Sequence, residues 1–177
     1  MLAKFIIIAF AAEALLTQNK ATGSCVSECP QWVKLNTSPV CFGAKGSQYG
    51  HFSYSEDISV RQFMLLHRSG KVTCRRSNDG SNWGCNPDQA GLSTILTDQQ
   101  NKILAPAASK VSENGWYTLA GYKSSSPFLA FCAQLPCQPV VIPANSELRL
   151  WYGEDLRYFT EGDNSGKTCA DVYAILA

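Results

Sequence analysis

Short apolar segments recur along the chain from residue 59 onward, separated by Gly, Pro, Asn and Ser. Residues 115–122 (GWYTLAGY) alternate aromatic and polar side chains, which is typical of a half-buried strand. No window shows the sustained 3.6-residue period of an amphipathic helix. The pattern predicts an all-β fold, an antiparallel β-sandwich or jelly roll, with further strands at 92–98, 101–109, 126–133, 138–144, 146–153 and 168–176. The alternative is an α+β fold with a helix within residues 98–112.

The stretch SVRQFMLLHRSGKVTCRR (residues 59–76) predicts a β-hairpin. Val60, Phe63 and Leu65 precede the turn-forming residues 68–71, and Val72 follows them. The same stretch holds five basic residues and no acidic one. A hairpin would gather them into one ridge that could pair with sulfated glycans or acidic matrix polymers, and the alternative is solvated loop charge. The predicted ridge consists of Arg61, Arg68, Lys71, Arg75 and Arg76.

Residues 1–23 have the pattern of a secretory signal peptide. Lys4 precedes a short apolar run over residues 5–12, and small residues suit cleavage after Gly23. The run is too short to cross a bilayer, which takes about 20 apolar residues. Removing two Lys and one Glu with the leader changes 15 basic and 14 acidic residues to 13 of each. We therefore predict a secreted domain of residues 24–177 with zero net charge, no membrane span and no nucleic-acid partner.

Eight cysteines follow the leader, and an even number in an oxidising compartment predicts disulfides. Cys74 and Cys85 enclose a turn-rich loop, and Cys132 and Cys137 enclose a tight one, so each pair predicts a local bridge. Another bridge is expected to tie the N-terminal segment to the last strand. Zinc ligation is a weaker alternative, because no His-x3-His pair lies nearby. The full set is Cys25, Cys29, Cys41, Cys74, Cys85, Cys132, Cys137 and Cys169.

The tripeptide Asn36-Thr37-Ser38 is the only Asn-x-Ser/Thr sequence in the chain with a permitted middle residue. In a eukaryotic secretory route such a sequence predicts N-glycosylation, and hence an exposed Asn36. The alternative is an acceptor sequence that is not used.

The segment EGDNSGKTCADVY (residues 161–173) contains Gly166-Lys167-Thr168, which resembles the end of a phosphate-binding loop. Such a loop needs a glycine at position 161, and the chain has a glutamate there. We therefore expect a turn between two strands rather than a nucleotide site. Oxygen ligands nevertheless gather in this region, and a calcium site is the weaker alternative. Its candidate ligands are Glu154, Asp155, Glu161 and Asp163.

Conventional catalytic signatures are missing from the sequence. There are two histidines, His51 and His67, no Gly-x-Ser-x-Gly elbow and no His-Glu-x-x-His. Residues 154 and 155 are both acidic, but adjacent residues of a strand point to opposite faces. We predict no enzymatic activity and no cofactor. The alternative is a secreted hydrolase or carbohydrate-active enzyme with an acidic site within residues 154–163.

Binding is the better-supported class of function. Besides the basic ridge, Trp83 and Trp116-Tyr117 lie in predicted loop regions or beside them, where aromatic rings could stack on sugars. The alternative places these rings in the core. The prediction is a secreted structural protein that binds extracellular-matrix components or glycans.

Three segments carry a resemblance to known proteins: VRQFMLLHRSGKVTCRR, GWYTLAGYKSSSP and LRLWYGEDLRYFTEGDNSGKTCADVYA. Over residues 58–177 the chain resembles a module of secreted cnidarian proteins, including uncharacterised skeletal organic matrix proteins of stony corals. The resemblance implies an extracellular, matrix-associated protein with a link to biomineralisation. It implies no catalytic residue.

Overall fold

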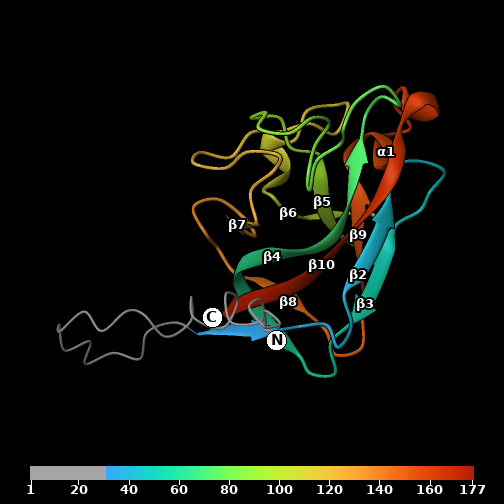
Figure 1. Ribbon diagram of the computed structural model, residues 1–177. Helices are drawn as coiled ribbons and strands as arrows, with labels where there is room; N and C mark the ends of the chain where they lie inside the picture. Colours follow the sequence, from blue (N-terminus) through green and yellow to red (C-terminus); the bar gives the residue numbers. More distant parts are fainter. Residues whose placement is uncertain (1–30) are drawn as a thin grey trace, which may run out of the picture.

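The computed structural model describes residues 31–177, which form two antiparallel β-sheets (Figure 1). The larger sheet has the order β1-β10-β4-β7, with β2 also paired to β10 and β8 to β4; the smaller has the order β3-β9-β5-β6. The larger sheet consists of β1 (Trp32–Lys34), β2 (Val40–Gly43), β4 (Ile58–Thr73), β7 (Phe128–Cys132), β8 (Val140–Ile142) and β10 (Ser165–Leu176). The smaller sheet consists of β3 (Gly50–Ser53), β5 (Thr94–Asp98), β6 (Ile103–Ala105) and β9 (Glu147–Tyr152).

The all-β prediction is confirmed, and the alternative helix within residues 98–112 is wrong. That segment forms β6 and the single 3-10 turn η2 (Ala108–Lys110). The α-helix of the described chain is α1 (Gly153–Arg157), and a second 3-10 turn, η3 (Glu161–Asp163), precedes β10. No helix in residues 31–177 is long and apolar enough to span a membrane. The predicted signal peptide lies outside the described residues.

The two sheets share one hydrophobic core. Side chains of the larger sheet, such as Phe63 and Val172, and of the smaller sheet, such as Leu96 and Leu150, belong to the same buried cluster. Buried residues alternate with more exposed ones along β7 and the first half of β4, as the period of 2 predicts, whereas β5 is buried at four successive positions. Burying this surface drives the two sheets together.

The predicted hairpin at residues 68–71 is wrong, because β4 is one strand of 16 residues. Turn-forming residues serve here as a β-bulge. Ser69 pairs with Cys169 and His67 with Ala170, so Arg68 is an extra residue on β4. Gly70 has φ +78°, and a Cβ atom there would lie 2.1 Å from the Lys167 carbonyl oxygen. A second register shift leaves Arg61 as the extra residue.

Three disulfides join the described residues. The predicted local bridges Cys74–Cys85 and Cys132–Cys137 are confirmed. Cys41–Cys169 ties the N-terminal part of the chain to the last strand, as predicted. Cys25 and Cys29 lie outside the described residues.

Residues 115–122, predicted as a strand, form a loop, which is joined to the chain beside β5 by the isolated bridge Leu92–Tyr117 and to β5 itself by a hydrogen bond from the Tyr117 hydroxyl to Thr94 O at 2.7 Å. Gly115 and Gly121 have φ of +85° and +82°, which interrupts an extended strand. Gly115 also packs directly on Gly153, at the start of α1, where a Cβ atom would lie 2.3 Å from the backbone. The loop is therefore held against α1.

Candidate functional site

The predicted acidic region lies where β9 runs into α1. Glu154 and Asp155 are both on the helix and both buried, so the expected strand geometry for this pair is wrong. Tyr158 ends the helix with φ +53°, and the chain then turns through η3 into β10. This sharp reversal brings the side chains of α1 and η3 close together.

Asp155 and Glu161 hold the turn between β2 and β3. The Asp155 carboxylate accepts hydrogen bonds from the backbone N–H groups of Ser47 at 2.8 Å and Gln48 at 3.0 Å. Glu161 accepts one from Gly46 at 2.8 Å. Burial, and next the neighbouring Glu161, raise the pKa of Asp155 to about 6. These two carboxylates are therefore occupied by the protein's own backbone.

Glu154 has a different environment. Its Oε1 accepts a hydrogen bond from the Trp116 indole at 2.9 Å, while its Oε2 is buried without a partner among residues 31–177. The Asn164 side chain lies beside it and lowers its pKa, although burial is the larger effect and raises that pKa overall. Asn164 is itself buried, with its Oδ1 also unpaired. The geometry thus leaves two buried oxygen acceptors unsatisfied in one place.

The predicted calcium ligands fall into these two groups rather than one. No group of three or more His, Cys, Asp or Glu side chains within residues 31–177 has a metal-binding arrangement. Asp163 is exposed and acts on Glu154 only through its charge, which raises the Glu154 pKa. Sequence reasoning missed Asn164, because a single Asn in a turn carries no signal of burial.

The Gly166-Lys167-Thr168 segment lies inside β10, and not at a helix N-terminus. Gly166 has φ +90° and packs on the Lys71 backbone, and Thr168 is buried. The expected turn precedes this segment and consists of residues 160–164, around η3.

The five residues of the predicted basic ridge are not gathered together. Arg61 and Arg68 sit at the two bulges of β4, and Arg68 Nε forms a 2.5 Å ion pair with the buried Asp171. Lys71, Arg75 and Arg76 lie at the far end of the strand, all exposed. Because β4 is one continuous strand, no hairpin gathers the five basic residues into one ridge. Their role in binding stays a prediction.

The predicted exposure of Asn36 is wrong. Only 5% of the residue is accessible, and its Nδ2, the atom that would carry a glycan, donates to Ser38 O at 2.8 Å and Asp171 Oδ1 at 2.9 Å. Its Oδ1 accepts a hydrogen bond from Val172 N at 2.7 Å. Lys34 and Arg68 complete the shell around Asp171. Asn36 therefore joins the N-terminal segment to β10.

The remaining candidate residues are divided between core and surface. Trp83 and Tyr117 are buried, which confirms the core alternative for both, while Trp116 is half-buried against Glu154. His67 bonds the Gly70 carbonyl at 2.9 Å, and His51 is exposed. Neither histidine contacts a carboxylate in the described residues.

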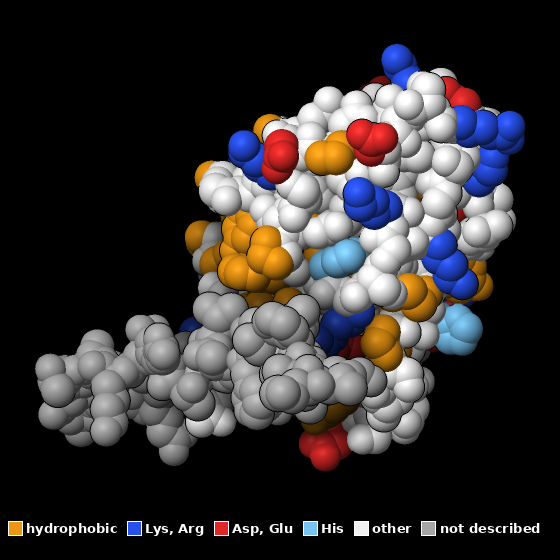
Figure 2. Space-filling view, viewed as in Figure 1, with side chains coloured by type: hydrophobic (Ala, Val, Ile, Leu, Met, Phe, Trp, Pro, Cys, Tyr) orange, Lys and Arg blue, Asp and Glu red, His pale blue; other side chains and the backbone are white. Residues whose placement is uncertain are grey.

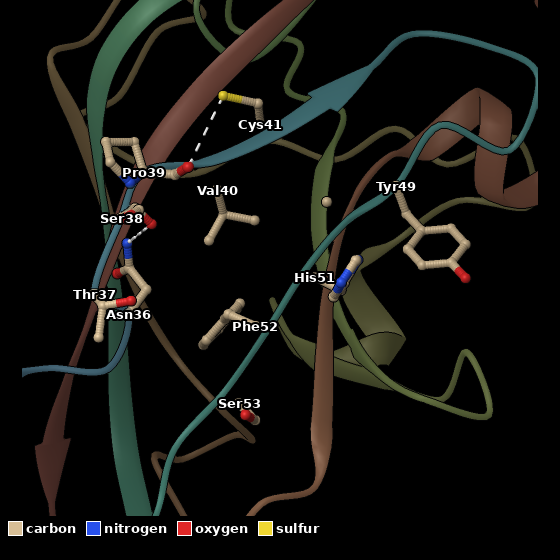
Figure 3. A pocket seen from close by; sticks show the side chains of 11 residues that line it. Asn36, Thr37, Ser38, Pro39, Val40, Cys41, Tyr49, His51, Phe52 and Ser53 are labelled. Atoms are coloured by element: carbon tan, nitrogen blue, oxygen red, sulfur yellow. Dashed lines mark hydrogen bonds between the residues drawn. The ribbon is translucent and has the colours of Figure 1, made fainter.

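A groove of about 560 Å³ opens between β2 and β3. The two strands meet at Gly43, whose N–H bonds Gln48 O at 2.8 Å, and then diverge because β2 pairs with β10 and β3 with β9. Figure 3 shows Val40 and Phe52 pointing into the space between them, while Tyr49 and His51 point away. Residues 36–41 form one wall and residues 49–53 the other. The described residues of the lining include no Lys, Arg, Asp or Glu.

No family model and no curated protein matches the chain. Among solved structures, the chain is similar to AJLec from the sea anemone Anthopleura japonica, with a TM-score of 0.74 and 37% sequence identity. The similarity covers 85% of this chain and 100% of AJLec.

The chain belongs to the AJLec family. Because sea anemones are cnidarians, this membership supports the cnidarian part of the resemblance seen in the sequence. The link to coral skeletal proteins stays a prediction.

Proposed function

We propose that this protein is a secreted, non-enzymatic glycan-binding protein of the extracellular matrix. The observation that carries the proposal is membership of the AJLec family, because the name of AJLec indicates a lectin. The three disulfides support an extracellular location, since such bridges persist in oxidising compartments. A place in a skeletal matrix is part of the proposal that rests on the sequence resemblance alone.

The groove between β2 and β3 is the site that fits a neutral sugar best. Its floor is apolar, from Val40 and Phe52, and its rim carries the hydroxyls of Thr37, Ser38 and Ser53. Both strands lie at sheet edges, so backbone N–H and C=O groups along them have no second strand partner within residues 31–177. Apolar patches with a few neutral donors and acceptors suit the two faces and the hydroxyls of a sugar ring.

The acidic region supports binding better than hydrolysis. A glycosidase needs two carboxyl groups on opposite sides of a substrate. Here Asp155 is fully buried under the backbone of residues 46–48, and Glu154 is turned toward Trp116 and Asn164. The carboxyl pair that does approach, Asp155 and Glu161, is used to hold a turn.

Calcium binding remains a proposal, and its candidate site is now the Glu154 side of the acidic region rather than Asp155 and Glu161. Glu154 Oε2 and Asn164 Oδ1 are hard oxygen donors without partners, and Ca²⁺ takes carboxylate and amide oxygens. A proton on Glu154 would satisfy the same two oxygens by donating to Asn164, which the raised pKa of Glu154 favours. A calcium effect at pH 7.5 that is lost at pH 5 would favour the ion.

The proposal is tested on a glycan microarray with the mature protein, residues 24–177. We expect saturable binding to a discrete set of glycans, and weaker binding by Ser53→Trp, which fills the groove. Thr118→Trp places the same ring on an exposed loop position away from the groove and should bind as wild type. Absence of binding to every glycan, with and without calcium, would refute the function; equal binding by the two variants would refute the groove.

A further inference from the structure

Two lysines stand directly opposite each other on the outer face of the larger sheet. Lys71 of β4 and Lys167 of β10 are cross-strand partners, and both are exposed. Their neighbours Val72 and Thr168 are buried, so the two lysines point away from the core. On its other side Lys167 faces Gly43 of β2, which has no side chain. Nothing in the sheet stands between the two ammonium groups and solvent.

Neither lysine forms a salt bridge with an acid of residues 31–177. The neighbouring outward positions hold Ser69, Cys169 and Cys41, and the last two form a disulfide. The salt bridges found within residues 31–177 are made by other cations, Lys34, Arg68 and Arg149. Like charges directly opposite each other on neighbouring strands destabilise a sheet. The stability of the fold therefore does not explain why Lys71 and Lys167 face each other.

The topology brings further cations to the same end of the larger sheet, which is called this edge below. Strands β2 and β4 both run antiparallel to β10, so both end where β10 begins. Lys45 follows β2 and donates to Gly162 O at 3.2 Å, just before β10. Arg75 and Arg76 follow β4 and are exposed. Figure 2 shows Lys and Arg side chains gathered at the upper right, over the part of Figure 1 where β2 and β4 end.

The acids at this edge are largely engaged elsewhere. Asp155 is buried, and Glu161 accepts the Gly46 N–H. Asp79 and Asp163 are exposed but form no salt bridge with a described cation. Glu154 is buried, and Arg75 acts on it only through its charge. On a mature chain of zero net charge, this edge is therefore a local concentration of positive charge.

We propose that this edge binds sulfated glycans, through a basic patch made of Lys45, Lys71, Arg75, Arg76 and Lys167. It extends the proposed glycan binding to anionic chains at a surface separate from the neutral groove. The paired ammonium groups of Lys71 and Lys167 contact successive sulfates along a linear chain, and Arg75 and Arg76 add planar, forked donors for sulfate oxygens. Arg61 and Arg68 are not part of the patch.

The test is titration of the mature protein with a heparin oligosaccharide at low and physiological salt. Each exposed ion pair contributes up to about a factor of five, so the double variant Lys71→Ala/Lys167→Ala should bind about tenfold more weakly. Lys71→Arg/Lys167→Arg should retain the affinity. Arg61→Ala is the matched control, an exposed cation on the same strand outside the patch, and should bind as wild type.

Four results would overturn the proposal. Two concern the variants: unchanged affinity in Lys71→Ala/Lys167→Ala, and an equal loss of affinity in Arg61→Ala. The third is equal affinity for desulfated heparin, and the fourth is equal affinity for duplex DNA, which would indicate unselective attraction to polyanions. Neutral glycans on the microarray should be bound equally by wild type and the double variant, so loss of that binding would concern the groove and the proposed function instead.

Discussion

Replacing Asn36 by Ala is predicted to destabilise the fold strongly. The amide makes three hydrogen bonds of 2.7–2.9 Å in a position that is 5% accessible. Its removal leaves the Val172 N–H without a partner and takes one donor from the buried Asp171. A buried polar group left unpaired costs about 1–3 kcal/mol, so we expect a loss of about 3 kcal/mol in the free energy of unfolding. For a domain of this size that is a fall of about 10 °C in melting temperature.

The matched control is Ser38→Ala, which removes the glycosylation sequence without touching the Asn36 amide. Ser38 takes part in this network only through its backbone carbonyl. When secreted from a eukaryotic host, the wild type and Ser38→Ala should show the same denaturation midpoint and carry no glycan mass, because a chain with a glycan on Nδ2 could not make the buried contacts of Asn36 and would not fold for secretion. Loss of a glycan mass in Ser38→Ala, or an Asn36→Ala variant as stable as wild type, would refute this reasoning.

Other contacts in the structure support four further predictions. The pKa of Asp155 is about 6 in the fold and 3.8 in the unfolded chain, so the folded state binds the proton more tightly. Lowering the pH from 7.5 to 5 should therefore raise the free energy of unfolding by about 1 kcal/mol in wild type. Urea denaturation of wild type and Asp155→Asn checks this, and a wild-type urea midpoint that falls over that pH range would contradict it. The double variant Cys41→Ser/Cys169→Ser opens a loop with a sequence separation of 128 and should lose about 4–5 kcal/mol, measured by the same melts; a change below about 1 kcal/mol would be inconsistent with the bridge. Lys167→Thr relieves a like-charged pair and should gain a few tenths of a kcal/mol, up to about 1, while binding heparin less well; a loss of stability would argue against the repulsion. Calcium at pH 7.5 should raise the melting temperature of wild type and leave Glu154→Gln unchanged, and an equal rise in both would place any ion elsewhere.

The sequence predicts the fold class because its strands are short, regularly spaced and bounded by turn residues. The local disulfides follow from short loops, whereas the sequence leaves the N-terminal partner of Cys169 open among Cys25, Cys29 and Cys41. The hairpin in β4 could not be distinguished from a bulge, since Ser69 and Gly70 suit both. Only pairing with β10, distant in sequence, decides between them.

The candidate sites are harder to predict because they depend on tertiary contacts. The Asn36 sequence looks like a glycan acceptor, and its burial arises from Asp171, 135 residues away. The opposition of Lys71 and Lys167 depends on strand register. The groove exists because β2 and β3, adjacent in sequence, join different sheets, which no local pattern records.

Glycan binding without catalysis is tested by calorimetric titration of the mature protein with each glycan bound on the microarray, followed by mass spectrometry of the recovered sugar. Reversible binding that saturates at a fixed stoichiometry, with the sugar recovered intact, is the predicted result. A sugar recovered in cleaved or modified form would contradict the assignment as a binding protein. The absence of any binding heat with every glycan would contradict it as well.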